Sequence, residues 1–539
     1  MMTKHIKQIL MAGFMGCGMA MAFTACSDWD DHYDGAKGAE GGSLTLWQQL
    51  QNNPQLSDFR EVLEQTKLFR QHKKTVVSYA DLLQSGQAFT VVAPVNGTFN
   101  KDSLLQLVKT NQGDSVVEKF FVLNHISRSA QSMTAQNEQM LLLNSKYVQI
   151  GNGEIQGVTV TDGNQHAKNG VLHVTARPLP YQYNLYEALN DRPELAVVGK
   201  QLRKYDEDYF DADASVSSGI VEGVPVYVDS VVIERNRMLQ NMGLIAAEDS
   251  TYWVVAPTTA GWQKAWDEAV KYFRYDTQVL KRDSIQHYWT TRALLDDAVY
   301  NMTDQLSTND SLVSVQYNRL KPEYHVFYKP FEAGGVLSKA KAIPCSNGTL
   351  YVTDEWPFTP EQTYFKELWS EGENTWLITQ ERDCYYNTRR LATDSISEGA
   401  YLQILPRNAT SNWELTFRVN NTLSGDYDVC AIILPKSVAD NPDVKPNKFK
   451  ASIVYTDTLG NEQVFNCNNT QFKNDPARID TVVLAEAFHF PVCNYDQNNI
   501  RVSVKIQCSI LARETSKYAR EMFLDCIYLR PRTSNSDEQ

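Results

Sequence analysis

Apolar residues in the first part of the chain recur at the three- and four-residue steps of amphipathic helices. This pattern covers residues 44–70 and 103–123. Between them, Phe89 to Pro94 forms a continuous apolar run that stops at a proline, which predicts a short buried strand. Residues 151–174 instead alternate between glycines, as short strands do. The first third of the chain therefore predicts a mixed α+β domain.

Two segments of this domain have counterparts further along the chain. FTVVAPVNGTF (89–99) is echoed by YWVVAPTTAGW (252–262), and KNGVLHVTARPLP (168–180) by SNGTLYVTDEWPF (346–358). Self-similarity of this kind indicates a duplicated unit. An added valine-rich segment around 205–245 predicts extra strand in the second copy.

The two segments resemble the signature segments of the fasciclin domain. The resemblance implies tandem fasciclin-like domains at 44–182 and 183–360, the second one diverged, because Thr258 stands where the family prefers asparagine. Both segments are structural in that family. His125 falls where fasciclin domains often carry a Tyr-His pair linked to adhesion, but Asn124 precedes it, so we expect a hydrogen-bonded core histidine.

From residue 361 the apolar positions alternate over short stretches separated by Asn-, Gly- and Asp-rich turns. A period of two with regular turns is typical of an antiparallel sandwich or jelly roll. Residues 423–435 (LSGDYDVCAIILP) resemble galactose-binding-like carbohydrate modules at the level of the fold. The predicted fold class is therefore multidomain, with α+β domains followed by an all-β sandwich at 361–539.

The N-terminal segment predicts export and lipidation. Residues 1–25 combine early lysines with a short apolar stretch and small residues, as a signal peptide does, and are too short for a membrane span. Cys26 then resembles the acylated cysteine of a bacterial lipobox, although Phe23 replaces the usual leucine. Residues 26–43 are acidic and glycine-rich, which is typical of a flexible tether. We expect a lipid-anchored protein of the outer membrane that faces outward.

Charge and cysteine content narrow the function classes. The chain carries a formal charge of −13, and loss of two lysines with the signal peptide makes the mature balance −15. This charge argues against nucleic acid as a partner. Without Cys17 and Cys26, seven of the nine cysteines remain, with no CxxC pair. We expect buried free thiols, although one or two disulfides stay open.

No motif in the sequence predicts catalysis, a metal site or a cofactor. The 64 Asp and Glu residues would allow a glycosidase pair, but the sequence does not single one out. The densest acidic run outside the tether, 206–213, is interpreted as a solvated loop, with a calcium loop as the alternative.

The sandwich offers candidate sugar-binding side chains, because sugar rings stack on aromatic faces while polar groups bond their hydroxyls. The candidates are aromatic residues with polar neighbours: Trp376, Tyr385, Tyr386, Arg382, Asp383 and Asn387. We therefore predict a non-enzymatic surface protein that binds glycan or assists an outer-membrane glycan importer. The alternatives are an adhesin or docking component that uses the fasciclin domains, and a carboxylate-based enzyme acting on glycans.

Overall fold

The computed structural model describes residues 42–532, apart from 71–72, 111, 222–223, 319–322, 392–394, 440–441, 498 and 500. The predicted signal peptide, Cys26 and nearly all of the tether therefore lie outside the described residues. The chain forms two compact units. The first unit comprises residues 1–188, 202–251 and 344–349, and the second comprises 189–201, 252–343 and 350–539.

The helix predicted over 44–70 forms in two pieces. Thr45 and Gln48 make a capping box that begins α2 (Leu46–Asn52). Pro54 then starts a short 3₁₀ turn before α3 (Ser57–Gln65), because proline cannot donate the hydrogen bond that a continuous helix requires. The prediction is wrong for residues 67–70, which form strand β1 rather than helix.

The helix predicted over 103–123 is also broken. It forms as α5 (Lys101–Val108) and α6 (Gly113–Val117), followed by the π-helical segment η2 (Glu118–Val122) and the 3₁₀ turn η3 (Leu123–His125). At Gly113 an added Cβ would lie 1.6 Å from the Leu107 carbonyl oxygen. This close approach of backbone, which the helical pattern hides, turns the chain between α5 and α6.

A seven-stranded sheet with the order β4-β3-β9-β8-β7-β6-β5 completes this region. Its second strand, β3 (Phe89–Pro94), lies between β4 and β9, is buried along its whole length, as its apolar run predicts, and pairs in parallel with β9 (Gly170–Thr175). The remaining elements are β2 (Lys73–Ser78), α4 (Tyr79–Gln84), β4 (Ile126–Ser127), β5 (Glu138–Leu141), β6 (Tyr147–Gly151), β7 (Glu154–Ile155) and β8 (Val158–Ala167).

A six-stranded sheet follows, with the order β15-β14-β13-β12-β17-β16. Its part β13-β12-β17-β16 has the order of β4-β3-β9-β8 in the first sheet, and β12 and β17 carry the echoed segments. The strands are β12 (Tyr252–Pro257), β13 (Val299–Asn301), β14 (Ser311–Asn318), β15 (Glu323–Tyr328), β16 (Lys341–Cys345) and β17 (Gly348–Thr353). The helices are α7 (Leu185–Asp191), α8 (Ala196–Arg203), α9 (Leu239–Met242), α10 (Thr259–Ala269) and α11 (Arg282–Leu295), with short turns η4 (Pro193–Leu195) and η5 (Asp296–Ala298).

The two regions share one buried hydrogen-bond arrangement. The side-chain oxygen of Asn169 accepts from the Leu46 N–H at the start of α2, and its amide donates to two backbone carbonyls. Asn347 accepts from the Leu185 N–H at the start of α7 and likewise donates to two carbonyls. In each region, the asparagine directly before a strand (β9 or β17) therefore fixes the first turn of the first helix of that region (α2 or α7).

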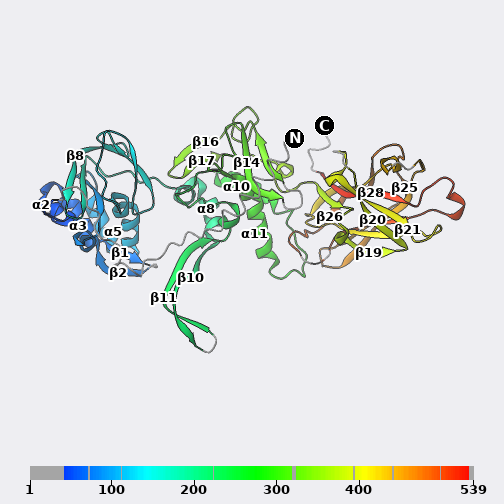
Figure 1. Cartoon of the computed structure of the whole chain (residues 1–539), viewed down its shortest axis with the longest axis horizontal. Coiled ribbons are helices and arrows are strands. Elements are labelled where there is room, and N and C mark those ends of the chain that lie inside the picture. The colour runs from blue at the N-terminus through cyan, green and yellow to red at the C-terminus, as the bar shows by residue number, and fades with distance from the viewer. Residues whose placement is uncertain are drawn as a thin grey trace. The chain divides into compact units, whose positions relative to one another are not determined.

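The valine-rich insertion forms a long hairpin, β10 (Asp206–Val221) and β11 (Val224–Asn236), drawn in green in Figure 1. It confirms the extra strand predicted there. The solvated loop predicted for 206–213 is wrong, because these residues belong to β10. Asp206 accepts hydrogen bonds from Tyr186 and Asn236, so this part of the acidic run has structural partners.

Two antiparallel sheets form the C-terminal sandwich, with the orders β20-β21-β28-β23-β26 and β19-β22-β27-β24-β25. Their inward residues share one core, which confirms the predicted sandwich. Phe273 and Tyr275 also belong to this core, although both precede residue 361. The strands are β18 (Leu368–Glu371), which pairs with β28, β19 (Ile378–Arg382), β20 (Cys384–Arg390), β21 (Ala400–Pro406), β22 (Glu414–Arg418), β23 (Gly425–Ile433), β24 (Lys448–Thr456), β25 (Glu462–Lys473), β26 (Asp480–Phe490), β27 (Ser503–Cys508) and β28 (Met522–Arg532).

The cysteines of the sandwich are reduced and buried, as predicted. Cys384, Cys430, Cys467, Cys493, Cys508 and Cys526 are all buried free thiols, and Cys345 is half-buried. Burial raises the pKa of the Cys430 thiol to about 11. In the part of the chain that the structure describes, no helix is long and apolar enough to cross a membrane.

Candidate functional site

The predicted sugar-binding residues lie on two edge strands of the sandwich. Strand β19 is the edge of the five-stranded sheet, and β20 is the edge of the other sheet. Trp376 lies in the short turn η7 (Thr375–Leu377) directly before β19 and is 62% exposed. Tyr385 lies near the start of β20 and is 58% exposed. Both rings are therefore available to a ligand.

Tyr386 does not belong to this surface. Successive side chains of a strand point to opposite faces, so Tyr385 and Tyr386 cannot both face outward. Tyr386 packs against the core of the sandwich, and a hydrogen bond to Glu381 raises the pKa of its hydroxyl to about 12. Asn387 shares the outward face with Tyr385 and is exposed. Five of the six predicted residues therefore remain candidates for sugar binding.

Arg382 is the last residue of β19, and Asp383 connects β19 to β20. Arg382 is held by an ion pair with Glu414 on the neighbouring strand β22. Asp383 has a left-handed backbone with φ of +57°, and its carbonyl accepts from the Arg407 N–H at 2.8 Å. The Arg407 guanidinium lies 5.6 Å from the centre of the Tyr385 ring. These contacts hold the polar groups beside Tyr385 in place.

The predicted residues do not all gather at one point. Trp376 and Arg382 are six residue steps apart in nearly extended chain, a path of about 20 Å. The Thr388 hydroxyl donates to the Glu373 carbonyl at 3.2 Å, so the far end of β20 comes close to the turn that precedes Trp376. Arg382, Asp383 and Tyr385 therefore lie toward one end of β20, and Trp376 lies toward the other end.

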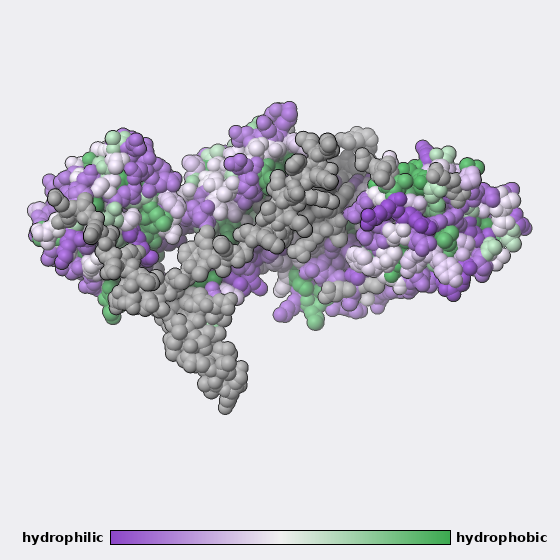
Figure 2. All heavy atoms as spheres, viewed as in Figure 1, coloured by the Kyte–Doolittle hydropathy of each residue, from purple (hydrophilic) through white to green (hydrophobic). Residues whose placement is uncertain are grey.

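A polar row beside these residues escaped the sequence analysis. Asn387 pairs with Gln403 across β20 and β21, and Gln403 accepts from Arg389 at 2.8 Å. Gln403 then donates to Glu521 at 2.6 Å, and Glu521 pairs with the buried Lys436 at 3.3 Å. Only the strand register brings these residues together, so no spacing in the sequence signals them. On the visible face of the sandwich, hydrophilic residues predominate with scattered apolar ones (Figure 2).

Three carboxylates lie close together at β18 and β28. Ser397 donates its hydroxyl to Glu371 at 2.7 Å and its N–H to Asp525 at 3.3 Å. Burial, reinforced by the neighbouring carboxylates, raises the pKa of Glu373 to about 7 and that of Asp525 to about 7. These groups therefore retain protons near neutral pH. Across the described residues, no three His, Cys, Asp or Glu side chains are grouped as a metal site requires.

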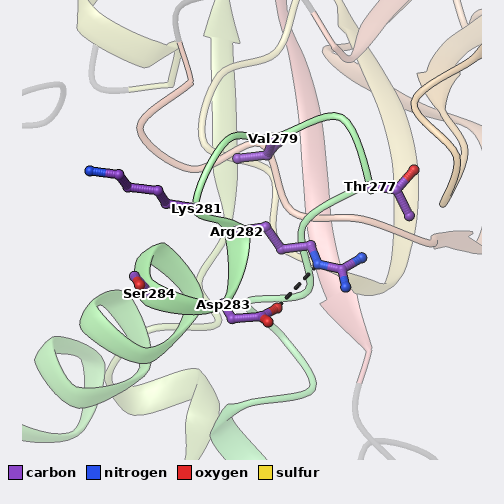
Figure 3. Close-up of a pocket in the computed structure, with 6 residues that line it drawn as sticks. All are labelled: Thr277, Val279, Lys281, Arg282, Asp283 and Ser284. Carbon is purple, nitrogen blue, oxygen red and sulfur yellow. Dashed lines mark hydrogen bonds and ion pairs between the residues drawn. The ribbon is translucent and has the colours of Figure 1, made fainter.

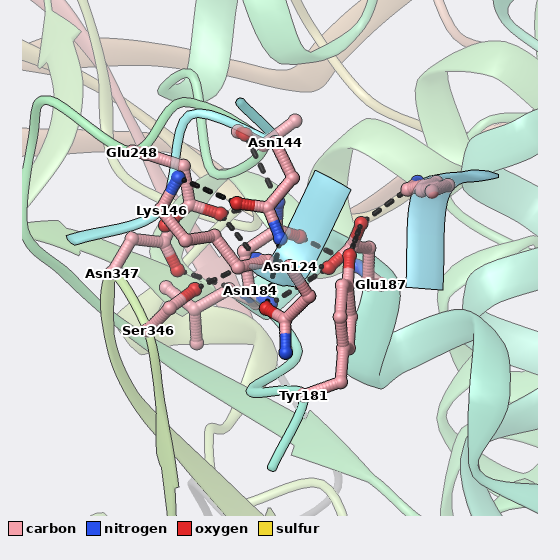
Figure 4. Close-up of polar contacts among 12 residues, drawn as sticks. Asn124, Asn144, Lys146, Tyr181, Asn184, Glu187, Glu248, Ser346 and Asn347 are labelled. Atoms are coloured by element: carbon pink, nitrogen blue, oxygen red, sulfur yellow. Dashed lines mark hydrogen bonds and ion pairs between the residues drawn. The ribbon is translucent and has the colours of Figure 1, made fainter. Parts of the chain in front are cut away.

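The first unit contains a buried lysine with a complete set of acceptors (Figure 4). The Lys146 ammonium lies 2.5 Å from Glu248, 3.2 Å from Glu187 and 3.1 Å from the Ser346 hydroxyl. Burial would raise the pKa of Glu187, but a hydrogen bond from Lys119 and the charge of Lys146 outweigh burial and lower it. Each ammonium proton has an acceptor, so we interpret this network as one that stabilises the fold.

His125 is a core histidine, as predicted. Its Nδ1 donates to the Phe121 carbonyl at 2.7 Å, and its Nε2 accepts from the Leu179 N–H at 3.0 Å. Burial lowers the pKa of the imidazole to about 4. Both ring nitrogens are occupied, so His125 has no free atom for a ligand.

A hollow of about 470 Å³ lies at the start of α11 (Figure 3). It is lined by Thr277, Val279, Lys281, Arg282, Asp283 and Ser284. Arg282 is turned toward Asp283, with 3.1 Å between Nε and Oδ1. This local pair of neighbours is the only interaction drawn among the lining residues, and no predicted site residue lies there.

Comparison with known proteins gives one family match, in which the model of the fasciclin domain matches residues 54–180. No curated protein matches the chain. Among solved structures, a FAS1 domain pair from the insect cell adhesion molecule fasciclin I is 12% identical, with a TM-score of 0.18, over 51% of this chain and 90% of that chain.

Two further structures contain xylan-related modules. A xylan-binding domain from CBM 22 is 10% identical, with a TM-score of 0.20, over 31% of this chain and 94% of that chain. The CBM22-1–GH10 modules of Clostridium thermocellum xylanase 10B are 10% identical, with a TM-score of 0.22, over 31% of this chain and 28% of that chain. TM-scores of this size carry no argument. The family match nevertheless shows that the chain contains a fasciclin domain at residues 54–180.

Proposed function

We propose that this protein is a non-enzymatic surface lipoprotein that binds glycan through its C-terminal sandwich, a galactose-binding-like module, beside an outer-membrane importer. The observation that carries the proposal is the exposure of Trp376 and Tyr385 on the sandwich, at 62% and 58%. A sugar ring presents C–H groups that pack on such aromatic faces. Arg382, Asp383 and Asn387 beside them supply donors and acceptors for hydroxyl groups.

In this proposal the region at 183–360 is a second, diverged fasciclin-like domain. The shared strand order and the matching contacts of Asn169 and Asn347 support it. The two domains would act as a spacer between the lipid on Cys26 and the sandwich. Changing Cys26 to serine is expected to release the protein from membranes, and a variant that stays in the membrane fraction would contradict the anchor.

A glycan array probed with soluble residues 36–539 tests the binding function. We expect a defined class of glycan to bind, and Trp376→Ala and Tyr385→Ala each to weaken binding by about tenfold, the loss of roughly 1.4 kcal/mol. Tyr386→Phe is the matched control, because Tyr386 packs against the core of the sandwich and does not share the outward face of Tyr385. Equal glycan binding by the wild type and both alanine variants would show that the binding site is not on this surface.

The fasciclin domain at 54–180 favours a second candidate, attachment to a protein partner. The insect protein named above is a cell adhesion molecule, and this chain would use the domain for docking. Such docking predicts a complex that can be purified from solubilised membranes without added glycan. A glycan-dependent complex, or none, would favour the first proposal.

A further inference from the structure

The connection between α10 and α11 packs into the C-terminal sandwich, although it lies well before residue 361 in the sequence. Residues 272–278, here called the strap, place Phe273 and Tyr275 in the sandwich core, where each is 3% exposed. Tyr272 packs on Phe365, with 4.5 Å between the ring centres. The strap and the sandwich belong to the same compact unit. The core of the sandwich is therefore not built from residues 361–539 alone.

The strap also bonds backbone groups of the sandwich. The Ser424 N–H, directly before β23, donates to the Tyr272 carbonyl at 2.9 Å. The Cys493 N–H, between β26 and β27, donates to the Arg274 carbonyl at 2.6 Å. Ser424 and Cys493 are buried, and a buried N–H without a partner is unfavourable. Two connections of the sandwich thus depend on carbonyl groups of the strap.

The turn between β24 and β25 is shaped to accept the far end of the strap. The Thr277 N–H donates to the Thr458 carbonyl at 3.1 Å, and the Gln278 amide donates to the Leu459 carbonyl at 3.0 Å. Gly460 follows with a left-handed backbone, φ +86°, and an added Cβ there would lie 2.5 Å from Cδ of Gln278. Glycine suits this position for both reasons.

A buried ion pair fixes the middle of the strap. Asp276 is fully buried, and one of its carboxylate oxygens pairs with Arg501 of the sandwich. Its other oxygen accepts from the Gln278 N–H at 2.9 Å. Removal of one partner from a buried ion pair leaves the other charge uncompensated, which is strongly destabilising.

We propose that the sandwich keeps its folded structure only while the strap is seated in it. The strap supplies two core side chains, two backbone acceptors and a buried carboxylate, so the partner that this surface of the sandwich fits is a segment of its own chain. This goes beyond the proposed function, in which the region at 183–360 acts as a spacer. It does not depend on glycan binding, because it concerns the protein without ligand.

Alkylation of the buried thiols by iodoacetamide tests the proposal on soluble residues 36–539, with each cysteine followed by mass spectrometry. Cys430 on β23 and Cys467 on β25 are buried and make none of the strap contacts described above, so they report opening of the sandwich itself. Asp276→Ala is expected to raise their alkylation rates about a hundredfold, because the Arg501 charge then stays buried without its partner.

Tyr275→Phe is a milder variant that keeps the buried ring. It removes only the hydrogen bond from the Tyr275 hydroxyl to the Tyr495 carbonyl, at 3.1 Å. Its alkylation rates at Cys430 and Cys467 are expected to rise about fivefold. This variant decides the test alone if Asp276→Ala cannot be purified in folded form.

Asp283→Ala is the matched control, because the Asp283 side chain is 88% exposed and pairs with the neighbouring Arg282. Its alkylation rates are expected to equal those of the wild type. Unchanged rates at Cys430 and Cys467 in the two strap variants would overturn the proposal. Equal acceleration by Asp283→Ala and Asp276→Ala would also overturn it, since the effect would then not come from the strap contacts.

Discussion

The seven-stranded and six-stranded regions share a backbone plan but place their histidines differently. In the first region, the turn η3 carries His125, whose two nitrogens are both bonded inside the core. In the second, the corresponding turn η5 carries Asp297, which reaches across to His325 and leaves Nε2 open. The comparison indicates that hydrogen bonds to the backbone maintain the shared fold of the two regions. The side chains at η3 and η5 determine whether a histidine is bonded inside the core or keeps one nitrogen open.

The largest expected effect comes from Lys146, which contacts both Glu187 and Glu248. Lys146→Met leaves these carboxylates without their buried cation and is expected to cost about 3–5 kcal/mol of unfolding free energy. Urea unfolding at pH 7 measures it. Lys119→Met is the matched control, since the Lys119 side chain is half exposed, and its cost should stay near 1 kcal/mol or less. Equal losses of unfolding free energy in the two variants would show that Lys146 stabilises the fold no more than the exposed Lys119 does.

The two asparagines test whether the regions share more than strand order. Asn169→Ala and Asn347→Ala each remove three hydrogen bonds to buried backbone and are expected to cost about 3 kcal/mol. Hydrogen exchange should then rise at the first turn of α2 in one variant and of α7 in the other. If only one of the two variants loses stability, the two asparagines do not have the same structural role.

His125 makes the first region sensitive to acid. Its pKa is about 4 in the folded protein, below the ordinary value near 6.5, so the folded state favours the neutral ring. This stability is present above pH 6.5 and is lost as the pH falls through 4, by about 1.4 kcal/mol per unit in between. Urea unfolding at pH 7, 6 and 5 measures the slope. His125→Gln is expected to flatten it, and an unchanged slope would assign the effect to another group.

The stability of the sandwich is expected to change with pH in the opposite direction, and by a smaller amount. The pKa of Asp525 is about 7 in the folded protein, above its ordinary value, so the folded state favours the protonated acid. The stability from this group is fully present below its ordinary pKa and is lost as the pH rises through about 7. Asp525→Asn is expected to raise the sandwich's unfolding free energy at pH 8 by about 1–2 kcal/mol. A lower unfolding free energy at pH 8 in the variant would contradict the protonated state.

Local patterns predicted much of the framework. The apolar run at 89–94 and the alternation within 151–174 predicted the strands β3 and β9, since both patterns depend on neighbours in sequence. The break at Gly113 was not predicted, because it depends on a backbone approach to Leu107 that no helical spacing reveals. The acidic run at Asp206 was misread for the same reason, since its partners Tyr186 and Asn236 are distant in sequence.

The candidate sites were less accessible to sequence reasoning. Strand alternation alone could have separated Tyr385 from Tyr386, and the structure places only Tyr385 outward. His325 and Asp297 lie 28 residues apart on different elements, so nothing in the sequence pairs them. Glu371 and Asp525 are further apart still, on β18 and β28. Such groups come together through strand register, which a single sequence does not specify.

The uneven distribution of cysteines makes transient opening of the sandwich detectable by thiol chemistry. Six buried cysteines lie in the sandwich, whereas none occurs between residues 27 and 344. A thiol reagent would therefore register each transient opening of the sandwich, while the fasciclin domain could open and close without leaving a chemical mark. In an oxidising compartment, each opening would give an exposed thiol the chance to form a disulfide, so oxidised sandwich would accumulate with time.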